Sequence, residues 1–185
     1  MHDNEFTITM KALEKGPVTL HVDCAPARLE LEDPQFGFVS PVVGEVGFSL
    51  ANPRVIATGT LETDVTTQCV RCLGDASLHV VAPVHTLYEN EKLIRDSRSE
   101  QVSPEEEVAV PFNGDWIQPE DELREAIMLE LPSLPLCDEA CKGLCPKCGI
   151  NLNEGTCNCS AAIQEENESV SPWKTALKGM KLNDK

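Results

Sequence analysis

Apolar and polar side chains alternate along the chain from residue 42 to residue 88. A period of two is typical of β-strands that bury one face. Turn residues divide the stretch into three strands, because Ala51-Asn52-Pro53 follows the first and Gln68 to Asp75 separates the second from the third. The buried face is predicted to contain Val42, Val46, Phe48, Leu50, Val55, Ala57, Leu61, Val65, Leu78, Val80, Ala82, Val84 and Tyr88. We therefore expect an antiparallel sheet with one buried face.

Shorter stretches extend this sheet. Val18 to Asp23 alternates in the same way and predicts a further strand, and Val108 to Phe112 predicts another short one. The segment from Glu91 to Glu107 is rich in charged residues and Ser, which predicts an exposed loop. Pro83 cannot donate a hydrogen bond to a neighbouring strand, so we expect a sheet edge or a bulge there.

The sequence predicts a helix from Pro119 to Leu131. Proline at the first position and acidic residues in the first turn suit a helix N-terminus. Pro132 ends the segment. Its apolar residues form one stripe that can pack on the sheet, namely Leu123, Ala126, Ile127 and Leu131. The predicted fold class is therefore α+β, an antiparallel β-sheet with one packed helix.

The C-terminal third of the chain is rich in cysteine, with six of the nine cysteines between Cys137 and Cys159. The run Cys145-Pro146-Lys147-Cys148-Gly149 has the form of a zinc knuckle, and Cys157-Asn158-Cys159 supplies a second pair. Two close pairs of thiolates match tetrahedral Zn²⁺ and predict a zinc-ribbon-like segment. A disulfide framework is the alternative, but an odd cysteine count and an acidic start without a secretory signal favour zinc and a cytoplasmic location.

A second knuckle lies between the second and third predicted strands, where Cys69 and Cys72 are separated by two residues. A redox pair of the thioredoxin type opens a helix after a strand, whereas this pair joins two strands, which favours half of a metal site. We predict two Zn²⁺ ions, the first held by Cys69, Cys72, Cys137 and Cys141, and the second by Cys145, Cys148, Cys157 and Cys159. The competing arrangement places Cys137, Cys141, Cys145 and Cys148 on one ion. Cys24 is left over and is expected to be a free thiol in the core.

The net charge changes what such a protein can bind. The formal net charge is −16, and each four-cysteine zinc site adds about −2, because four thiolates outweigh one Zn²⁺. A phosphate backbone repels such a body, whereas basic partners, ribosomal proteins included, are attracted to it. The alternative is that the charge only maintains solubility. No run approaches the ~18 apolar residues of a membrane span.

Catalysis has no candidate in the sequence. We find no Ser/His/Asp set, no HExxH motif and no glycine-rich phosphate loop, so no enzyme is predicted. His79 and His85 fall on the mixed outer face of the third strand and are expected to be surface residues rather than ligands.

The chain is expected to divide into a sheet-and-helix domain (1–136), the zinc-ribbon-like segment (137–160), an acidic linker (161–171) and a basic amphipathic tail (172–185). The tail predicts a short C-terminal helix with an apolar stripe beside a stripe of lysines. The residues expected to bind a partner or RNA are Trp173, Lys174, Leu177, Lys178 and Lys181. Docking of the apolar stripe on the chain's own domain is equally compatible with the pattern.

Several motifs resemble the YceD-like family, bacterial and plastid proteins described as large ribosomal RNA subunit accumulation proteins. They are C-V-R-C-L in the hairpin turn, L-E-L-P-S-L-P-L-C after the helix, C-K-G-L-C-P-K-C-G-I-N-L-N-E-G-T-C-N-C, and S-P-W-K-T-A-L-K-G-M-K at the end. The likeness in order and spacing runs from about Val42 to Lys181. It implies a role in making or stabilising large-subunit rRNA during assembly of the large ribosomal subunit, and it implies no catalytic residue.

The resemblance and the charge together predict a non-catalytic ribosome-biogenesis factor. We expect it to bind a basic ribosomal protein or assembly factor, with the lysine tail as its RNA contact. A zinc-thiolate redox-sensing holdase, in which oxidation ejects the metal, is the alternative.

Overall fold

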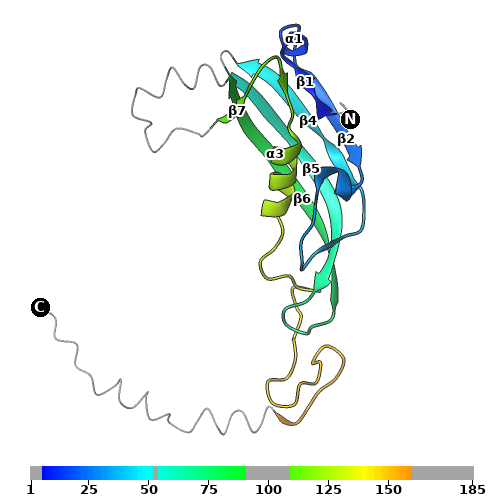
Figure 1. Cartoon of the computed structure of the whole chain (residues 1–185). Helices are drawn as coiled ribbons and strands as arrows, with labels where there is room; N and C mark the ends of the chain where they lie inside the picture. The colour runs from blue at the N-terminus through cyan, green and yellow to red at the C-terminus, as the bar shows by residue number, and fades with distance from the viewer. Residues whose placement is uncertain (1–5, 52–53, 91–108, 160–185) are drawn as a thin grey trace, which may run out of the picture.

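The computed structural model describes residues 6–51, 54–90 and 109–159. Among them it places strands, two α-helices and one 3₁₀ helix along an elongated body (Figure 1). In chain order the elements are β1 (Ile8–Thr9), α1 (Met10–Leu13), β2 (Val18–Cys24), the 3₁₀ helix η2 (Pro26–Leu29), β3 (Gly37–Phe38), β4 (Val42–Ala51), β5 (Arg54–Gln68), β6 (Asp75–Asn90), β7 (Val110–Phe112), β8 (Trp116–Ile117) and α3 (Glu120–Leu129). The predicted loop 91–107 and the C-terminal helix lie outside the described residues.

The three alternating stretches form the strands β4, β5 and β6, as the sequence predicts. The main sheet has the order β2-β4-β5-β6-β7, and β3 pairs with β5 beyond the end of β4. The long β5–β6 hairpin pairs from Arg54 opposite Glu89 to Gln68 opposite Asp75, so its turn holds the first cysteine pair. The predicted inward residues Val42, Leu61 and Ala82 are each fully buried. The fold class is therefore α+β, as expected.

Two short strands depart from a purely antiparallel sheet. β7 runs parallel to β6, with Tyr88 opposite Val110 and Asn90 opposite Phe112, so the main sheet is mixed. A tight turn forces neighbouring strands to run antiparallel, whereas residues 91–109 separate β6 from β7 in the chain, long enough for a parallel pair. β8 does not join the main sheet but pairs with β1 in a separate two-stranded sheet.

Helix α3 covers one face of the main sheet (Figure 1). Leu123 and Ile127 are fully buried in the core, and Ala126 packs at its margin. The Tyr88 hydroxyl donates a hydrogen bond to Oε2 of Glu122 at 3.2 Å, which joins β6 to the helix. Partial burial raises the pKa of the Glu122 carboxyl. The helix ends at Leu129, and Leu131 instead packs against a small separate cluster of Phe36, Val65 and Val80.

The uncovered face of the hairpin is mostly polar, although Val81 is exposed there. His79 is exposed there, with Nδ1 2.8 Å from Oδ1 of Asp64 and Nε2 3.6 Å from Oε2 of Glu62. His85 is also exposed, so both histidines are sheet-face residues as predicted. Pro83 lies opposite Thr60, on a part of β6 that has no strand on its other side among the described residues. No described helix is long and apolar enough to cross a membrane.

Candidate metal centres

The β5–β6 hairpin places the first cysteine pair at the far end of the sheet domain. The turn from Cys69 to Gly74 projects beyond the part of the sheet that α3 covers (Figure 1). The chain leaving α3 returns to this turn, where the backbone N–H of Val70 donates to the carbonyl of Pro135 at 3.0 Å. That contact delivers Cys137 to the hairpin, although it is far away in sequence.

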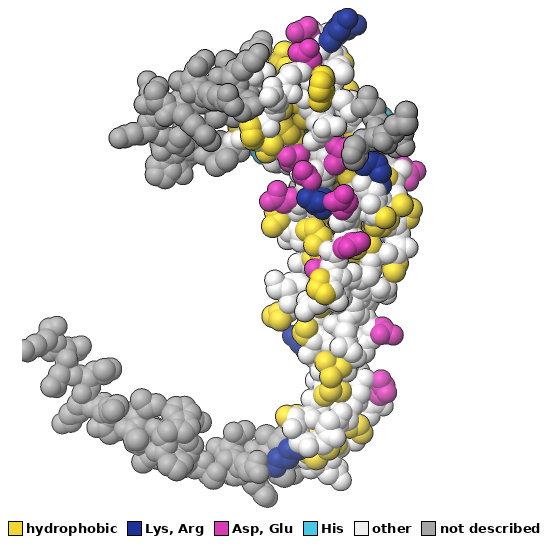
Figure 2. Space-filling view, viewed as in Figure 1, with side chains coloured by type: hydrophobic (Ala, Val, Ile, Leu, Met, Phe, Trp, Pro, Cys, Tyr) yellow, Lys and Arg dark blue, Asp and Glu magenta, His cyan; other side chains and the backbone are white. Residues whose placement is uncertain are grey.

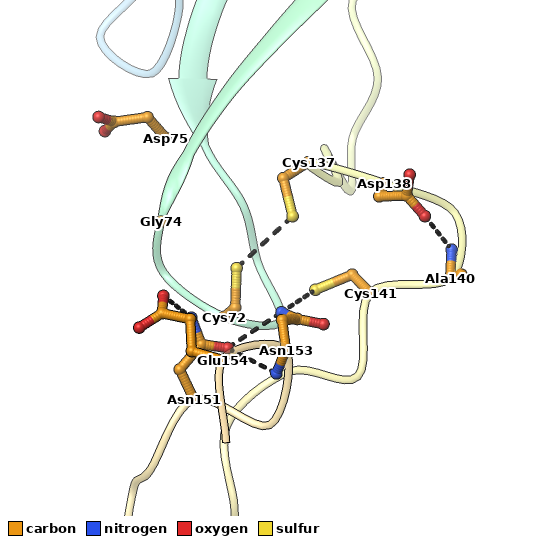
Figure 3. A pocket seen from close by; sticks show the side chains of 10 residues that line it. All are labelled: Cys72, Gly74, Asp75, Cys137, Asp138, Ala140, Cys141, Asn151, Asn153 and Glu154. Carbon is orange, nitrogen blue, oxygen red and sulfur yellow. Dashed lines mark hydrogen bonds between the residues drawn. The ribbon is translucent and has the colours of Figure 1, made fainter.

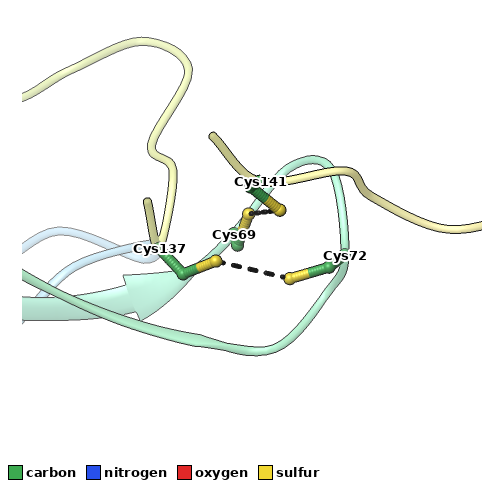
Figure 4. A group of neighbouring side chains, drawn as sticks. All are labelled: Cys69, Cys72, Cys137 and Cys141. Atoms are coloured by element: carbon green, nitrogen blue, oxygen red, sulfur yellow. Dashed lines mark hydrogen bonds between the residues drawn. The ribbon is translucent and has the colours of Figure 1, made fainter. Parts of the chain in front are cut away.

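Four sulfur atoms converge at this point (Figure 4). We call Cys69, Cys72, Cys137 and Cys141 the hairpin cluster. The Cys69 and Cys141 sulfurs lie 3.8 Å apart, those of Cys72 and Cys137 lie 3.6 Å apart, and all four lie within 4.8 Å of one another. Tetrahedral Zn²⁺ with Zn–S bonds of about 2.3 Å requires sulfurs about 3.8 Å apart. A disulfide would need about 2.05 Å, so the spacing fits a metal and not a disulfide.

A second group of four sulfurs lies further along the chain. Cys145, Cys148, Cys157 and Cys159, which we call the ribbon cluster, also have all ligand atoms within 4.8 Å. The eight cysteines thus separate into the two groups that the sequence predicts. The competing group, which combined Cys137 and Cys141 with Cys145 and Cys148, does not form. Each cluster could hold one metal ion.

The two knuckle turns have the same backbone structure. In each turn, the carbonyl of the first cysteine accepts a hydrogen bond from the backbone N–H four residues later. The backbone N–H of that same cysteine donates to the carbonyl five residues later, and all these distances are 2.8 to 2.9 Å. The four bonds run from Leu73 N to Cys69 O, Cys69 N to Gly74 O, Gly149 N to Cys145 O, and Cys145 N to Ile150 O. Leu73 and Gly149 both have left-handed backbones, with φ of 59° and 72°. The shared geometry turns both cysteines of each pair toward one point.

Hydrogen bonds lower the pKa of one thiol and raise the pKa of another within each cluster. The backbone N–H of Cys72 lowers the pKa of Cys69 to about 6, while the Cys72 side chain raises the pKa of Cys137 to about 12. The ribbon cluster divides in the same way, with the pKa of Cys145 lowered to about 6 and that of Cys159 raised to about 12. Thiolates packed this closely repel one another, and a bound cation removes that repulsion.

Arg71 ties the hairpin turn to the segment that supplies the other two ligands. Its Nη1 donates to the carbonyls of Glu139 at 3.2 Å and Cys141 at 3.0 Å. In return, the backbone N–H of Leu144 donates to the Arg71 carbonyl at 3.0 Å. Gly143 has φ +74°, and a Cβ there would lie 3.0 Å from that same carbonyl oxygen. The close approach explains a glycine at this position.

One side of the hairpin cluster opens to solvent. A hollow of about 480 Å³ lies beside it, and its lining includes Cys72, Cys137, Asp138 and Asn153 (Figure 3). Cys69 has no exposed surface, whereas Cys137 is exposed. Solvent therefore reaches the cluster on the Cys137 side.

The family model described as "Large ribosomal RNA subunit accumulation protein YceD" matches residues 57–181. The chain belongs to the YceD family. The match includes every cysteine of the hairpin and ribbon clusters, which agrees with the motifs that carry the resemblance in the sequence.

Three relatives are similar to all or part of the chain. The chain is 27% identical over 181 residues to an uncharacterized protein of Mycobacterium leprae, covering 97% of this chain and 78% of the relative. An uncharacterized protein of Mycobacterium tuberculosis is 33% identical over 98 residues, 53% of this chain and 45% of the relative. The chloroplastic YCED homolog 1 of Arabidopsis thaliana, named a large ribosomal RNA subunit accumulation protein, is 40% identical over 50 residues, 27% of this chain and 15% of that protein. No solved structure matches the chain.

Two further predictions have other outcomes. Cys24 ends β2 and is half-buried at the margin of the core rather than inside it. The tail residues Trp173, Lys174, Leu177, Lys178 and Lys181 lie outside the described residues. The sequence analysis did not find Arg71 or Asn153, because a single polar residue among cysteines carries no periodic signal.

Proposed function

We propose that this chain is a non-catalytic factor that supports accumulation of large-subunit rRNA during assembly of the large ribosomal subunit. Membership of the YceD family is the observation that supports this role. Each cysteine cluster is proposed to bind one Zn²⁺, because four thiolates at tetrahedral spacing suit that ion. The ions would fix the turn and the ribbon segment as a rigid end of the molecule.

The charge of the body favours a basic protein as the direct partner. Acidic side chains gather on the face that α3 occupies (Figure 2). The helix and its end carry Glu120, Asp121, Glu122, Glu125 and Glu130. A hollow of about 400 Å³ between α3 and β6 has a mixed lining, in which Leu87, Val110 and Leu129 lie beside Glu122 and Glu125. A basic ribosomal protein or assembly factor with an amphipathic segment matches both properties.

Cells depleted of the protein test this function. We expect the ratio of large-subunit to small-subunit rRNA to fall and to recover with the wild-type chain. Leu129→Asp should fail to restore the ratio, because Leu129 is 75% exposed at the proposed surface. Val81→Asp is the matched control, since Val81 is 47% exposed on the opposite face of the sheet. An unchanged rRNA ratio after depletion refutes the proposed role in rRNA accumulation. If Leu129→Asp restores the ratio, only the proposal that the partner binds at this surface is refuted.

The lysine tail is proposed as the RNA contact, because it carries Lys174, Lys178 and Lys181 on an otherwise acidic chain. A gel shift with large-subunit rRNA at physiological salt should detect at most weak binding that disappears when residues 172–185 are deleted. Tight binding that survives the deletion contradicts the proposed protein partner. If mild peroxide releases metal and exposes apolar surface while rRNA levels are independent of the protein, the redox-sensing holdase replaces this proposal.

A further inference from the structure

We propose that the hairpin and ribbon clusters bind metal cooperatively, and that Asn153 is the positioning residue that transmits the coupling. This inference rests on the proposed function, in which both clusters bind metal. The two clusters could still each bind metal without any coupling between them. Asn153 belongs to the loop between Cys148 and Cys157 of the ribbon cluster, yet its side chain reaches a ligand of the hairpin cluster.

The Asn153 side chain is held from several sides (Figure 3). Its Nδ2 donates to the sulfur of Cys141 at 3.2 Å, and its Oδ1 accepts the backbone N–H of Lys142 at 2.8 Å. Nδ2 and the backbone N–H of Asn153 also donate to Oδ1 of Asn151, at 3.0 and 3.1 Å. Oδ1 of Asn153 therefore faces the N–H of Lys142, and Nδ2 of Asn153 faces the sulfur of Cys141. This orientation presents an N–H group to the Cys141 thiolate.

The position of Asn153 depends on the ribbon segment being ordered. Backbone bonds join this loop to the approach to the hairpin cluster, since Leu144 pairs with Asn151 and the N–H of Leu152 donates to Gly143 at 2.9 Å. Apolar burial contributes little here, because Ile150 is 41% exposed and Cys145 is the buried hydrophobic residue of the described ribbon segment 145–159. A metal ion in the ribbon cluster would supply the order that the missing apolar core does not.

Hydrogen bonds to a metal ligand fix its orientation and tune its charge, and their loss typically reduces metal affinity by about 10- to 100-fold. Loading the ribbon cluster should therefore raise the affinity of the hairpin cluster by placing the Asn153 amide on Cys141. Linkage makes the coupling reciprocal, so loading the hairpin cluster must raise the affinity of the ribbon cluster by the same factor.

Titration with cobalt(II) against a competing chelator, on the full chain, tests the coupling. Cys157→Ser with Cys159→Ser leaves only the hairpin cluster, and we expect its affinity to fall about 10- to 100-fold relative to the intact chain. Asn153→Ala should weaken the hairpin cluster to a similar extent while two ions still bind. Asn153→Asp keeps an acceptor for Lys142 but loses the donor to the sulfur, so it should not restore affinity. Asn158→Ala is the matched control, because Asn158 is exposed in the same segment.

A double-mutant cycle identifies Asn153 as the carrier. In the chain that lacks Cys157 and Cys159, Asn153→Ala should have little further effect, within about 2-fold. Full additivity of the two changes overturns the assignment to Asn153. Equal affinities of the hairpin cluster with and without the ribbon cluster overturn the cooperativity. If cobalt and zinc bind to neither cluster, the proposed metal binding itself fails, which is a separate result.

Discussion

Gly143→Ala tests how the hairpin turn is held against the segment that follows α3. Gly143 has a left-handed backbone with φ +74°, and an added Cβ would lie 3.0 Å from the carbonyl oxygen and 3.2 Å from the Cβ of Arg71. That carbonyl accepts the backbone N–H of Leu144 at 3.0 Å. The methyl group must therefore displace the backbone between Cys69 and Cys72, which carries two ligands of the hairpin cluster.

The magnitude follows from two separate costs. A left-handed backbone costs a residue with a Cβ about 1 to 2 kcal/mol. Forcing the neighbouring turn to move costs about 1 to 3 kcal/mol more. Gly149→Ala pays only the first cost, because Gly149 has φ +72° and no atom lies within 4 Å of its added Cβ. The difference between the two variants therefore reports the contact alone, about 1 to 3 kcal/mol or roughly 5- to 150-fold in affinity.

The assay is titration with cobalt(II) against a competing chelator. It measures the cobalt affinity of the hairpin cluster in Gly143→Ala and that of the ribbon cluster in Gly149→Ala. Gly155→Ala is the control, since its added Cβ would meet only Cδ1 of Ile150 at 3.7 Å. It should leave both affinities within a few fold. Equal losses in Gly143→Ala and Gly149→Ala would refute the contact with Arg71 as the reason for a glycine at position 143.

Three further results are expected. Cys69→Ala should lose one of two bound zinc ions by elemental analysis, because it removes a ligand of the hairpin cluster alone. Ile127→Ala should lower the free energy of unfolding in urea by about 2 to 5 kcal/mol, whereas Leu129→Ala, at an exposed position, should change it by less than about 0.5 kcal/mol. His79→Gln should destabilise the protein below pH 6.5, because a hydrogen bond to Asp64 raises the folded-state pKa of His79 above that value. This loss should disappear as pH rises through the folded-state pKa and should shrink with added salt; a pH-independent loss would contradict it.

Periodicity and turn chemistry were sufficient to predict the main sheet and α3. The strands β4, β5 and β6 each have at least ten residues, so their alternation identifies the buried face without any tertiary information. The grouping of the cysteine sulfurs was the favoured of two predicted arrangements, because a metal site half formed by the hairpin turn would require two more ligands from elsewhere. Cys137 and Cys141 were available once the ribbon pairs had used one another.

The shortest strands and some strand directions could not be predicted, for a physical reason. β1 and β8 have two residues each, too few for a period. The stretch Val108 to Phe112 did predict β7, but the parallel pairing of β7 with β6 is fixed by packing rather than by local sequence. The contacts of Arg71 and Asn153 are likewise tertiary. Each donates to a group in a segment that only the folded chain brings near, so composition and spacing give no indication of them.

The position where the core ends supports the proposed metal at the hairpin end. The main core packs between the sheet and α3. Within residues 6–51, 54–90 and 109–159, the cluster of buried residues around the turn consists of Cys69, Cys72, Ala76 and Cys141, with Leu136 partly buried beside them. Full burial of one leucine contributes about 1.5 to 3 kcal/mol, whereas ordering the backbone costs about 1 to 2 kcal/mol for every residue of the turn. Apolar burial alone therefore does not offset the cost of ordering this end. A structural Zn²⁺ contributes roughly 10 to 16 kcal/mol in small zinc-binding peptides, which is enough to do so. The hairpin end is accordingly the part of the sheet domain that should loosen first when a chelator removes the metal.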